Sequence, residues 1–419
     1  MIDWLSIVRP HDQLVCSHMT SEPVALLQSL GRSPPNVPFG VTLGVPFTLA
    51  ANDLPAHAKL TTFGGMGSAR LLARDRTLNI SRTPYSQCEA EYLPGGLVSD
   101  VVLVSLSRAP DGRLYLGASH GYIADAARRA RLVIAEINAR APCVFGSLWP
   151  ADIAIQHAVE VDYALAPNAD EPVDSVTTQA LIAAQVAALI PDGACLQVGI
   201  GGLPSSLLSA LQSHRHLGIH SGAMTDAMYD LISRGVIDHS RKPADSRRAV
   251  IGSLYGSPKL YEFAHLNDQI EMRAPSFTHS VKTIAKLNDF MAINSAIEVD
   301  LTGQINAEAV LGSNGTLRYV GGVGGLNDMM HAASLAPRGQ SIIALPSRTG
   351  GGTAGKPRIV AQLSGPATVC SAYADLVVTE HGVARLKGKT PAQRAKQMLS
   401  IADPQDHDLL AAQARAMGF

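Results

Sequence analysis

Residues 217–226 place an imidazole and a carboxylate on a short run of small residues. The run reads Leu-Gly-Ile-His-Ser-Gly-Ala-Met-Thr-Asp, so that His220 and Asp226 stand six positions apart. Histidine and aspartate can take or give a proton during a reaction. We expect a buried strand to run out here into an active-site loop. A single His or Asp at the end of a strand is more often a hydrogen-bonded structural group, so both roles stay open.

A glycine-rich loop lies upstream of this run, between an expected strand and an expected helix. Backbone N–H groups at such a turn can face a phosphate or a developing oxyanion. A dinucleotide fingerprint would need glycine where Pro204 stands, and a P-loop would need Gly-Lys-Ser/Thr. A tight turn without any ligand is the alternative. The loop consists of Gly199, Ile200, Gly201, Gly202 and Leu203.

Two later glycine clusters could also contact a ligand. In the first, four glycines in five positions allow a close backbone approach to something flat or bulky, but Asn327 breaks the dinucleotide pattern. The second, residues 349–356, is either a phosphate-binding lid to which Lys356 adds a cation or a flexible surface loop. The glycines of the first cluster are Gly321, Gly322, Gly324 and Gly325.

Residues 117–121 read Gly-Ala-Ser-His-Gly and match the G-x-S-x-G pattern between a strand and a helix. In a nucleophile elbow of this kind, Ser119 would attack an acyl carbon. A serine hydrolase is therefore one possible function. A strand-to-helix turn built from small residues explains the same pattern, and we favour that explanation.

Acids and thiols elsewhere have less specific surroundings. Glu298 and Glu380 adjoin apolar runs, where burial beside a ligand would raise a carboxyl pKa, although a cap or turn-fixing role is the simpler interpretation. Cys195 and Cys370 lie in apolar, strand-like runs and are expected to be buried structural thiols. The five cysteines form no CxxC pair, which argues against a zinc site or disulfide framework and for a reducing cytoplasm.

The composition limits the classes of protein to which this chain can belong. A chain of 419 residues, 46% hydrophobic and 16% charged, predicts two domains with large buried cores. The net charge of −1 and the lack of long charged runs give no indication of nucleic acid or a membrane surface as a partner. No run of eighteen apolar residues and no signal-peptide pattern occurs.

Alternating strand and helix patterns predict an α/β fold with mostly parallel sheets covered by helices. The polar, proline-bearing segment 166–174 suggests a boundary, which gives domains 1–172 and 173–419. Strands are expected at residues 101–105, 114–116, 132–137, 194–198, 249–253, 290–293, 341–345 and 367–379, and helices at 123–130, 176–189, 205–212 and within 391–417.

The second half of the chain resembles a known family. Residues 293–308 read Ile-Asn-Ser-Ala-Ile-Glu-Val-Asp-Leu-Thr-Gly-Gln-Ile-Asn-Ala-Glu and resemble a signature of the acetyl-CoA hydrolase/transferase family, which includes 4-hydroxybutyrate and butyryl-CoA:acetate CoA-transferases. The likeness is dense from about residue 176 to residue 410 and continues through several blocks. These blocks are residues 189–204, 217–237, 321–325, 342–347, 377–384, 386–389 and 400–404.

The resemblance implies two α/β domains of CoA-transferase type, usually in a homodimer, and a CoA thioester as substrate with no tightly bound cofactor and no metal. A small carboxylate would be the second substrate. In the family a glutamate attacks the thioester and carries first the acyl group and then CoA, which splits one hard exchange into easier steps. The loops at residues 199–203 and 321–325 would lie around the CoA thioester.

One departure from the family concerns the nucleophile itself. The family reads Gly-Ile-His-Thr/Ser-Glu where this chain has residues 218–222, so the glutamate falls on Gly222. Three further differences suggest a remodelled pocket. Leu326 replaces a Gln, Pro357 replaces a Ser, and Ser371 replaces an Arg.

Glycine has no side chain that could form an acyl anhydride, so three hypotheses about the function follow. In the first, the chain acts on an acyl-CoA without a glutamyl intermediate, by hydrolysis or a related reaction, with His220 or Asp226 as base. In the second, ordinary CoA transfer uses another carboxylate, such as Glu298 or Glu271. In the third, the chain binds CoA without catalysis.

Overall fold

The computed structural model describes residues 2–75, 77–166, 176–243, 247–312, 314–350 and 355–419. The chain divides into two compact units. The first consists of Met1–Asn168, Val250–Thr278 and Val320–Gly324, and the second of Ala169–Ala249, His279–Tyr319 and Gly325–Phe419. The expected boundary between residues 172 and 173 lies outside the described residues, and two segments from the second half of the chain join the first unit.

The first unit is built on a mostly parallel sheet in the order β4-β3-β2-β1-β5-β7-β8, with β6 antiparallel to β5. The β-branched run at the start of β5 is buried throughout, as expected for a strand covered on both faces. The strands are β1 (Gln13–Cys16), β2 (Gly40–Gly44), β3 (Lys59–Thr62), β4 (Leu78–Ile80), β5 (Val101–Arg108), β6 (Leu114–Tyr115), β7 (Leu132–Asn138) and β8 (His157–Val161).

Two helices cover this sheet with apolar stripes. Helix α2 (Val24–Arg32) buries Leu26, Leu27 and Leu30 in one core cluster with β1, β2 and β5. Helix α4 (Ile123–Arg129) contributes to a second cluster that contains the alternate residues of β1 and β5. Smaller helices are α1 (Trp4–Ile7) and α3 (Ala69–Asp75), and the segment 250–278 adds β11 (Ala249–Tyr255), α8 (Pro258–Ala264), β12 (Ile270–Met272) and α9 (Pro275–Thr278).

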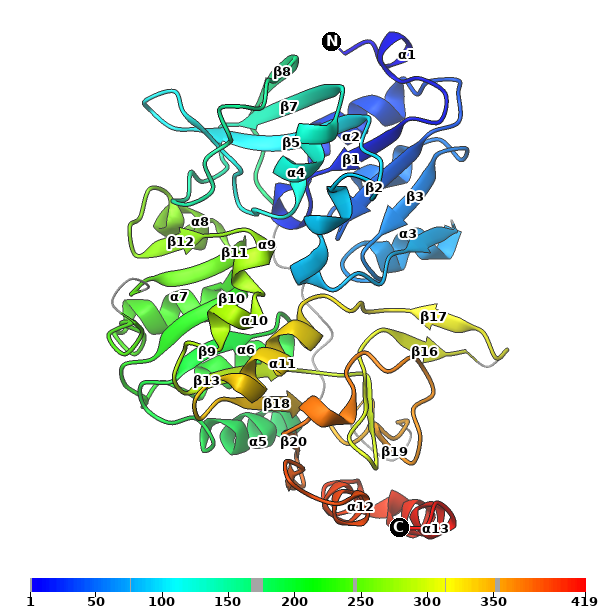
Figure 1. The fold of residues 1–419 in the computed structure, drawn as a ribbon, viewed down its shortest axis with the longest axis vertical. Helices are drawn as coiled ribbons and strands as arrows, with labels where there is room; N and C mark the ends of the chain where they lie inside the picture. The colour runs from blue at the N-terminus through cyan, green and yellow to red at the C-terminus, as the bar shows by residue number, and fades with distance from the viewer. Residues whose placement is uncertain (1, 76, 167–175, 244–246, 313, 351–354) are drawn as a thin grey trace. The chain divides into compact units, whose positions relative to one another are not determined.

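In the second unit the main strands follow one another in the order β10-β9-β13-β18-β20-β21, parallel except for β21. Figure 1 shows α10 and α11 lying across β9, β13 and β18. The strands are β9 (Cys195–Val198), β10 (Gly218–Thr225), β13 (Phe290–Asn294), β18 (Gln340–Ala344), β20 (Leu376–Thr379) and β21 (Gly382–Arg385), and the helices α5 (Val176–Ala187), α6 (Gly202–Ser209), α7 (Asp226–Ser233), α10 (Val281–Ile284) and α11 (Leu326–Leu335).

A smaller lobe of the second unit includes most of the family signature, residues 293–308. It contains the three-stranded sheet β15-β14-β19 and the hairpin β16–β17. Helix α12 starts with a capping box between Thr390 and Gln393, and its buried side chains join a core cluster with those of α13. The elements are β14 (Glu298–Asp300), β15 (Ile305–Asn306), β16 (Ala309–Leu311), β17 (Leu317–Tyr319), β19 (Ile359–Val360), α12 (Pro391–Leu399) and α13 (His407–Ala416).

Most of the predicted strands and helices are confirmed, but the strand at residues 367–379 is wrong. Only β20 is a strand there, because Val369 makes a single bridge to Ile305 and the chain then turns through a 3-10 helix, Ser371–Tyr373. Arg394 donates a hydrogen bond to the Ser371 carbonyl at 2.8 Å and holds this turn. Cys370 is consequently exposed, which corrects the expectation of a buried thiol, whereas Cys195 is buried as expected.

The predicted helix at residues 205–212 begins three residues earlier, at Gly202. Pro204 does not prevent this, because proline is tolerated in the first turn of a helix, where its missing N–H has no intrahelical partner. The glycine loop before the helix is therefore shorter than the sequence suggested.

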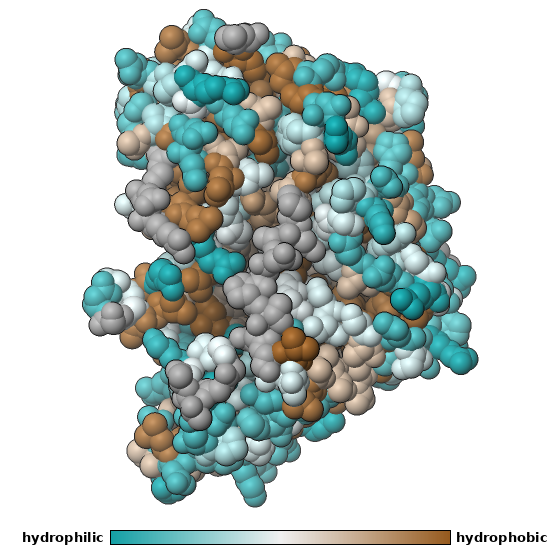
Figure 2. Space-filling view, turned by 180° about the vertical axis from the view of Figure 1, so that it is seen from behind, coloured by the Kyte–Doolittle hydropathy of each residue, from teal (hydrophilic) through white to brown (hydrophobic). Residues whose placement is uncertain are grey.

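On one face of the molecule, hydrophobic and hydrophilic residues alternate (Figure 2). Figure 2 shows hydrophobic residues interspersed among hydrophilic ones on the face seen from behind. The hairpin β16–β17, for example, carries exposed Leu311 and Leu317. Apolar residues spread in this way are normal for a protein surface and do not mark a site.

Candidate functional site

The run at residues 217–226 is a strand almost to its end, which corrects the expectation of a loop. Strand β10 covers Gly218–Thr225, and α7 begins directly at Asp226. Small side chains let the strand stay extended inside the protein. Of its eight residues only Gly222 is partly exposed, and the other seven are buried. The strand therefore reaches the surface at Gly222.

Neighbouring groups hold β10 in register at Ile219. This residue pairs with Leu196 of β9. Its N–H donates to Nδ1 of His239 at 3.3 Å, and its carbonyl accepts from Nζ of the buried Lys242 at 2.8 Å. With Ile219 fixed, the alternation of the strand places residues 220 and 222 on the same face.

The two acid–base candidates of this run have different surroundings. His220 is buried, and its ring meets the edge of Phe290 with centroids 6.3 Å apart. Asp226 is half-buried in the first turn of α7, where a carboxylate is favoured by the helix dipole. Strand β10 therefore ends between these two residues.

A third titratable side chain, His279, lies against Gly222, and sequence reasoning missed it. A Cβ built on Gly222 would stand 3.0 Å from Nε2 and 3.1 Å from Cε1 of this imidazole. His279 follows α9 in the chain and precedes Ser280, the N-cap of α10. A lone histidine 57 residues further along the chain carried no pattern that could have linked it to β10.

Gly325 packs against the same ring from the start of α11. A Cβ on Gly325 would stand 2.2 Å from Cδ2 and 2.4 Å from Nε2 of His279, so only glycine leaves room for the imidazole. The ring is 4% exposed, and burial lowers the pKa of His279 to about 3. The imidazole is therefore neutral at physiological pH and lies beneath two partly exposed glycines.

The loop at residues 199–203 is a tight connection from β9 to α6. Gly201, the N-cap of α6, has a φ of +127°, a conformation that favours glycine. Below the loop the amides of Gln197 and Asn294 exchange hydrogen bonds of 3.0 and 2.9 Å. Ile200 is exposed. A role for this loop in binding CoA stays a prediction.

The glycine cluster at residues 321–325 is split between the two units. In the first unit the Gly321 carbonyl accepts from the Gly65 N–H at 2.7 Å, and the Gly324 carbonyl accepts from the Tyr85 N–H at 2.8 Å. A Cβ on Gly322 would stand 2.6 Å from the Phe63 carbonyl oxygen. Close backbone packing therefore explains part of this cluster, and its expected contact with CoA stays a prediction.

The buried carboxylate of Glu298 fixes a turn. Its Oε1 accepts from Nδ2 of Asn306 at 2.9 Å and from the N–H of Ser364 at 2.7 Å. The Ser364 hydroxyl donates to the same carboxylate at 2.9 Å. These bonds tie β14 to β15 and to the segment after β19. They support the structural interpretation of Glu298.

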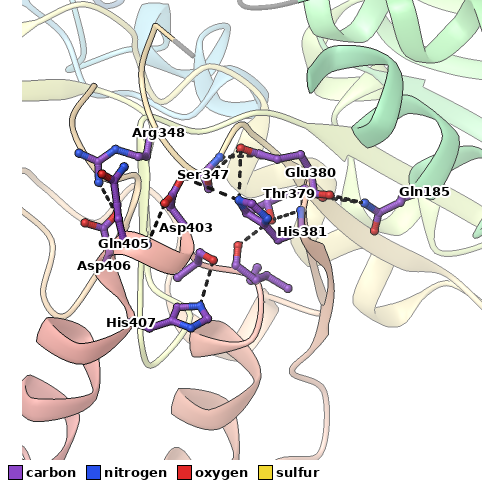
Figure 3. A network of polar contacts seen from close by, with 12 residues as sticks. Gln185, Ser347, Arg348, Thr379, Glu380, His381, Asp403, Gln405, Asp406 and His407 are labelled. Carbon is purple, nitrogen blue, oxygen red and sulfur yellow. Dashed lines mark hydrogen bonds and ion pairs between the residues drawn. The ribbon is translucent and has the colours of Figure 1, made fainter. Parts of the chain in front are cut away.

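Glu380 has a similar role at the turn between β20 and β21 (Figure 3). Its carboxylate accepts from the N–H of Ser347 at 2.9 Å and from the Ser347 hydroxyl at 2.7 Å. Its backbone carbonyl and that of Thr379 accept from the side chain of Gln185 on α5, at 3.3 and 3.0 Å. Figure 3 also shows His381 beside this carboxylate, with Nε2 at 3.7 Å from Oε1.

The G-x-S-x-G segment is a structural turn in the first unit. The Ser119 side chain is buried, and its hydroxyl lies 2.8 Å from the Ser253 hydroxyl. The neighbouring His120 Nδ1 contacts the Gly121 carbonyl at 3.2 Å. A hydroxyl paired with another hydroxyl lacks the activating base that a nucleophilic serine needs.

Lys356 closes the base of the third glycine loop. Its N–H donates to the Thr349 hydroxyl at 2.8 Å, and its carbonyl accepts from the Thr349 N–H at 2.9 Å. Residues 351–354 of this loop lie outside the described residues. The expected phosphate contact of Lys356 stays a prediction.

In the described ranges, no group of three or more His, Cys, Asp or Glu residues could hold a metal ion. In the same ranges, no helix has the length and apolar character needed to cross a membrane.

Comparison with known proteins decides the family. Residues 256–414 match the acetyl-CoA hydrolase/transferase C-terminal domain. The 4-hydroxybutyrate coenzyme A transferase of Clostridium kluyveri is 31% identical over 420 residues, covering 97% of this chain and 94% of that protein. The chain belongs to the acetyl-CoA hydrolase/transferase family. The resemblance found in residues 293–308 is thereby confirmed.

Other members of the acetyl-CoA hydrolase/transferase family extend the comparison. The crystal structure of RipA from Yersinia pestis superposes with a TM-score of 0.87, is 28% identical, and covers 99% of this chain and 96% of its own. This confirms the α/β, two-domain CoA-transferase fold. The acetyl-CoA hydrolase of Candida albicans is 28% identical over 51% of this chain and 38% of that enzyme. Both transferases and hydrolases are thus among the relatives.

Proposed function

We propose that the chain acts on an acyl-CoA thioester without forming a glutamyl intermediate, and that hydrolysis is the simplest such reaction. The observation that carries this proposal is the contact between Gly222 and His279. By family resemblance, the nucleophilic glutamate belongs at residue 222. Here the strand carries no side chain, and the imidazole of His279 lies 3.0 Å from where a Cβ would start.

The other proposed parts of the site suit a reaction in which the acyl group is transferred to water. The N–H groups at the start of α6, next to Gly201, would stabilise the developing oxyanion. The loops 199–203 and 321–325, with Lys356, are the proposed CoA contacts. A cytoplasmic homodimer completes the proposal by analogy with the family.

Conventional CoA transfer is the second candidate, because the named relatives with the highest coverage are transferases. It would need another carboxylate. Glu298 is already held by Asn306 and Ser364, and Glu271 forms an ion pair of 2.8 Å with Arg273. Either carboxylate would have to leave these partners to attack a thioester, which favours hydrolysis.

A panel of acyl-CoAs tests the proposal. Acetyl-, propanoyl-, butyryl-, succinyl- and 4-hydroxybutyryl-CoA are incubated with the protein, and free thiol is measured in the absence and presence of acetate. We expect at least one thioester to release thiol without acetate. Release that requires acetate, with label from acetate entering acyl-CoA, would establish transfer in place of hydrolysis. Binding of CoA without any turnover would indicate a non-catalytic protein.

A further inference from the structure

We propose that a pocket in the first unit binds a small organic cation, a primary ammonium group carried on an apolar or aromatic body. The pocket has a volume of about 360 Å³. It is lined by the loop after β7, the segment after β8, and α8 with the residue that follows it. These segments all belong to the first unit and contain no residue of the proposed thioester site, so the inference is independent of the proposed function.

Hydrogen bonds hold the walls of this pocket in place. Asn138, which is buried at the end of β7, donates from Nδ2 to the Tyr163 carbonyl at 3.0 Å and accepts at Oδ1 from the Arg140 N–H at 3.0 Å. The Cys143 carbonyl accepts from the Leu266 N–H at 2.7 Å, just beyond α8. The two loops and the end of α8 are therefore tied together. Walls that are already fixed lower the cost of ordering the site when a ligand binds.

The pocket combines a buried floor with an exposed rim. Pro142, Leu165 and Tyr261 line the pocket and are buried. Glu262 and His265 also line it, and both are exposed. Solvent therefore reaches the polar side chains of the rim, while the floor is mostly apolar. An apolar lining with a few polar groups is the usual composition of a small-molecule site.

One negative charge on the rim has no compensating partner. The Glu262 carboxylate forms no ion pair or hydrogen bond with any residue in the described part of the chain. Arg140, the guanidinium of the rim, is instead paired with Asp162. Lys259, the other charged residue of α8, does not line the pocket. The charge of Glu262 therefore decides which sign of ligand charge the pocket favours.

The groups beside Glu262 also favour an ammonium ligand. The Cys143 N–H donates to Nδ1 of His265 at 3.2 Å, so this nitrogen is already used as an acceptor. Glu262 is then the charged acceptor left on the rim. The ring of Tyr261 in the lining attracts a cation over its face. Carboxylates and CoA thioesters, the substrates of the proposed function, would instead meet a like charge, which costs affinity.

The volume limits the size of the ligand. Pockets for small molecules span roughly 300–1,000 Å³, so this one lies at the small end of the range and suits a single ring with a short side chain. 2-Phenylethylammonium has this form. Its ring would lie on the floor at Leu165 and Tyr261, and its ammonium group would donate to the Glu262 carboxylate.

Three probes of similar shape and different charge test the proposal on the full chain. 2-Phenylethylammonium, the neutral 2-phenylethanol and the anion 3-phenylpropanoate are titrated at neutral pH, and Kd is measured by ligand-observed NMR. We expect the ammonium to bind with a Kd on the order of 1 mM. The alcohol should bind about fivefold more weakly and the anion at least about tenfold more weakly. Equal affinity for the three probes, or no saturable binding of the ammonium, would overturn the proposal.

Two substitutions locate the binding. Glu262→Gln should weaken binding of the ammonium about fivefold and leave the alcohol unchanged, because only the charge is removed. Ala164→Phe narrows the pocket from an exposed part of its lining and should abolish binding of both probes. Thermal unfolding checks that each variant is folded. Ammonium affinity that is unchanged in Glu262→Gln or in Ala164→Phe would overturn the assignment to this pocket.

The matched control is Glu160→Gln. Glu160 is an exposed carboxylate of β8 that pairs with Arg108 at 2.9 Å and does not line the pocket. We expect this variant to bind the ammonium as the wild type does. A loss as large as that in Glu262→Gln would show that the general charge of the first unit attracts the probe, and would overturn the proposal. No step uses a thioester, so these results stand apart from those that test the proposed hydrolysis.

Discussion

Nε2 of His279 lies 3.0 Å from the point where a Cβ on Gly222 would stand. The two residues constrain one another, because a side chain at 222 needs room that the imidazole occupies. This relationship ties the loss of the family glutamate to a specific neighbour. It also changes the CoA-transfer activity that we expect when glutamate is restored at residue 222.

We expect Gly222→Glu alone to restore little CoA transfer. The new side chain would be crowded against a buried ring, and overpacking of this kind typically costs about 1–3 kcal/mol. The double variant Gly222→Glu/His279→Ala removes the obstruction. Transfer of label from free acetate into acyl-CoA should be clearly faster in the double variant than in the single one.

The single variant Gly222→Glu and the double variant are compared at equal concentration of folded protein. His279→Ala is the control, because it has no carboxylate at residue 222. Equal exchange in the single and double variants would show that His279 does not restrict position 222.

Gly325→Ala should disable the site through the ring it displaces. Its Cβ would stand 2.2 Å from Cδ2 of His279, so the imidazole has to move. A displacement of about 1 Å beside a reacting centre can cost on the order of 100-fold in rate. We expect a loss of this size in kcat for thioester cleavage.

Gly31→Ala is the matched control for that experiment. Gly31 lies in α2 of the first unit, and its Cβ would meet Asp53 at 2.8 Å. This variant should lose stability but retain turnover per folded molecule. Wild-type kcat in Gly325→Ala would show that thioester cleavage does not depend on the packing around Gly222.

His279 should make the protein sensitive to acid. Its pKa is about 3 in the folded protein and about 6.5 in the unfolded chain, so below pH 6.5 the unfolded state binds a proton that the folded state does not. The stabilisation is complete above pH 6.5 and is lost as pH falls toward 3. Between pH 6 and 4, the free energy of unfolding of His279→Gln should fall less steeply, by about 1.4 kcal/mol per pH unit.

Urea denaturation at a series of pH values measures this slope. His239→Gln should show the same change down to about pH 4, because burial lowers the pKa of His239 to about 4. Parallel pH profiles for the wild type and His279→Gln would mean that His279 is protonated in the folded protein.

Ser119→Ala should leave turnover unchanged. The hydroxyl pairs with that of Ser253 at 2.8 Å, so its removal costs only the order of 1 kcal/mol for a lost hydrogen bond. Ser253→Ala should have a similar effect on the melting temperature. Loss of thiol release in Ser119→Ala but not in Ser253→Ala would instead support the serine hydrolase.

The elements that the sequence predicted best are those with continuous apolar patterns. The strands β5 and β7 are long, buried runs, β9 and β13 are shorter runs that are buried almost throughout, and each appeared where hydrophobicity indicated. The short strands β1–β4 lie among prolines, where three to five residues do not establish a period. Residues 367–379 misled because their apolar residues are divided between the bridge at Val369, a 3-10 turn that contains Ala372, and strand β20.

The site was only partly predictable for a different reason. Family resemblance located Gly222 through the contiguous run around β10. His279 reaches that position only through the tertiary fold, and Gly325 appeared in the sequence as one more residue of a glycine cluster. The requirement for glycine at 325 becomes visible only when the imidazole that it faces is in place.

The most direct test of the central claim follows the oxygen atoms of the reaction. The protein is incubated with its preferred acyl-CoA in water enriched in a heavy oxygen isotope, with labelled acetate also present. The account predicts one heavy oxygen in each released acid, thiol in equal amount, and no label from acetate in the acyl-CoA. Acyl-CoA labelled from acetate, formed while thioester is conserved, would contradict it.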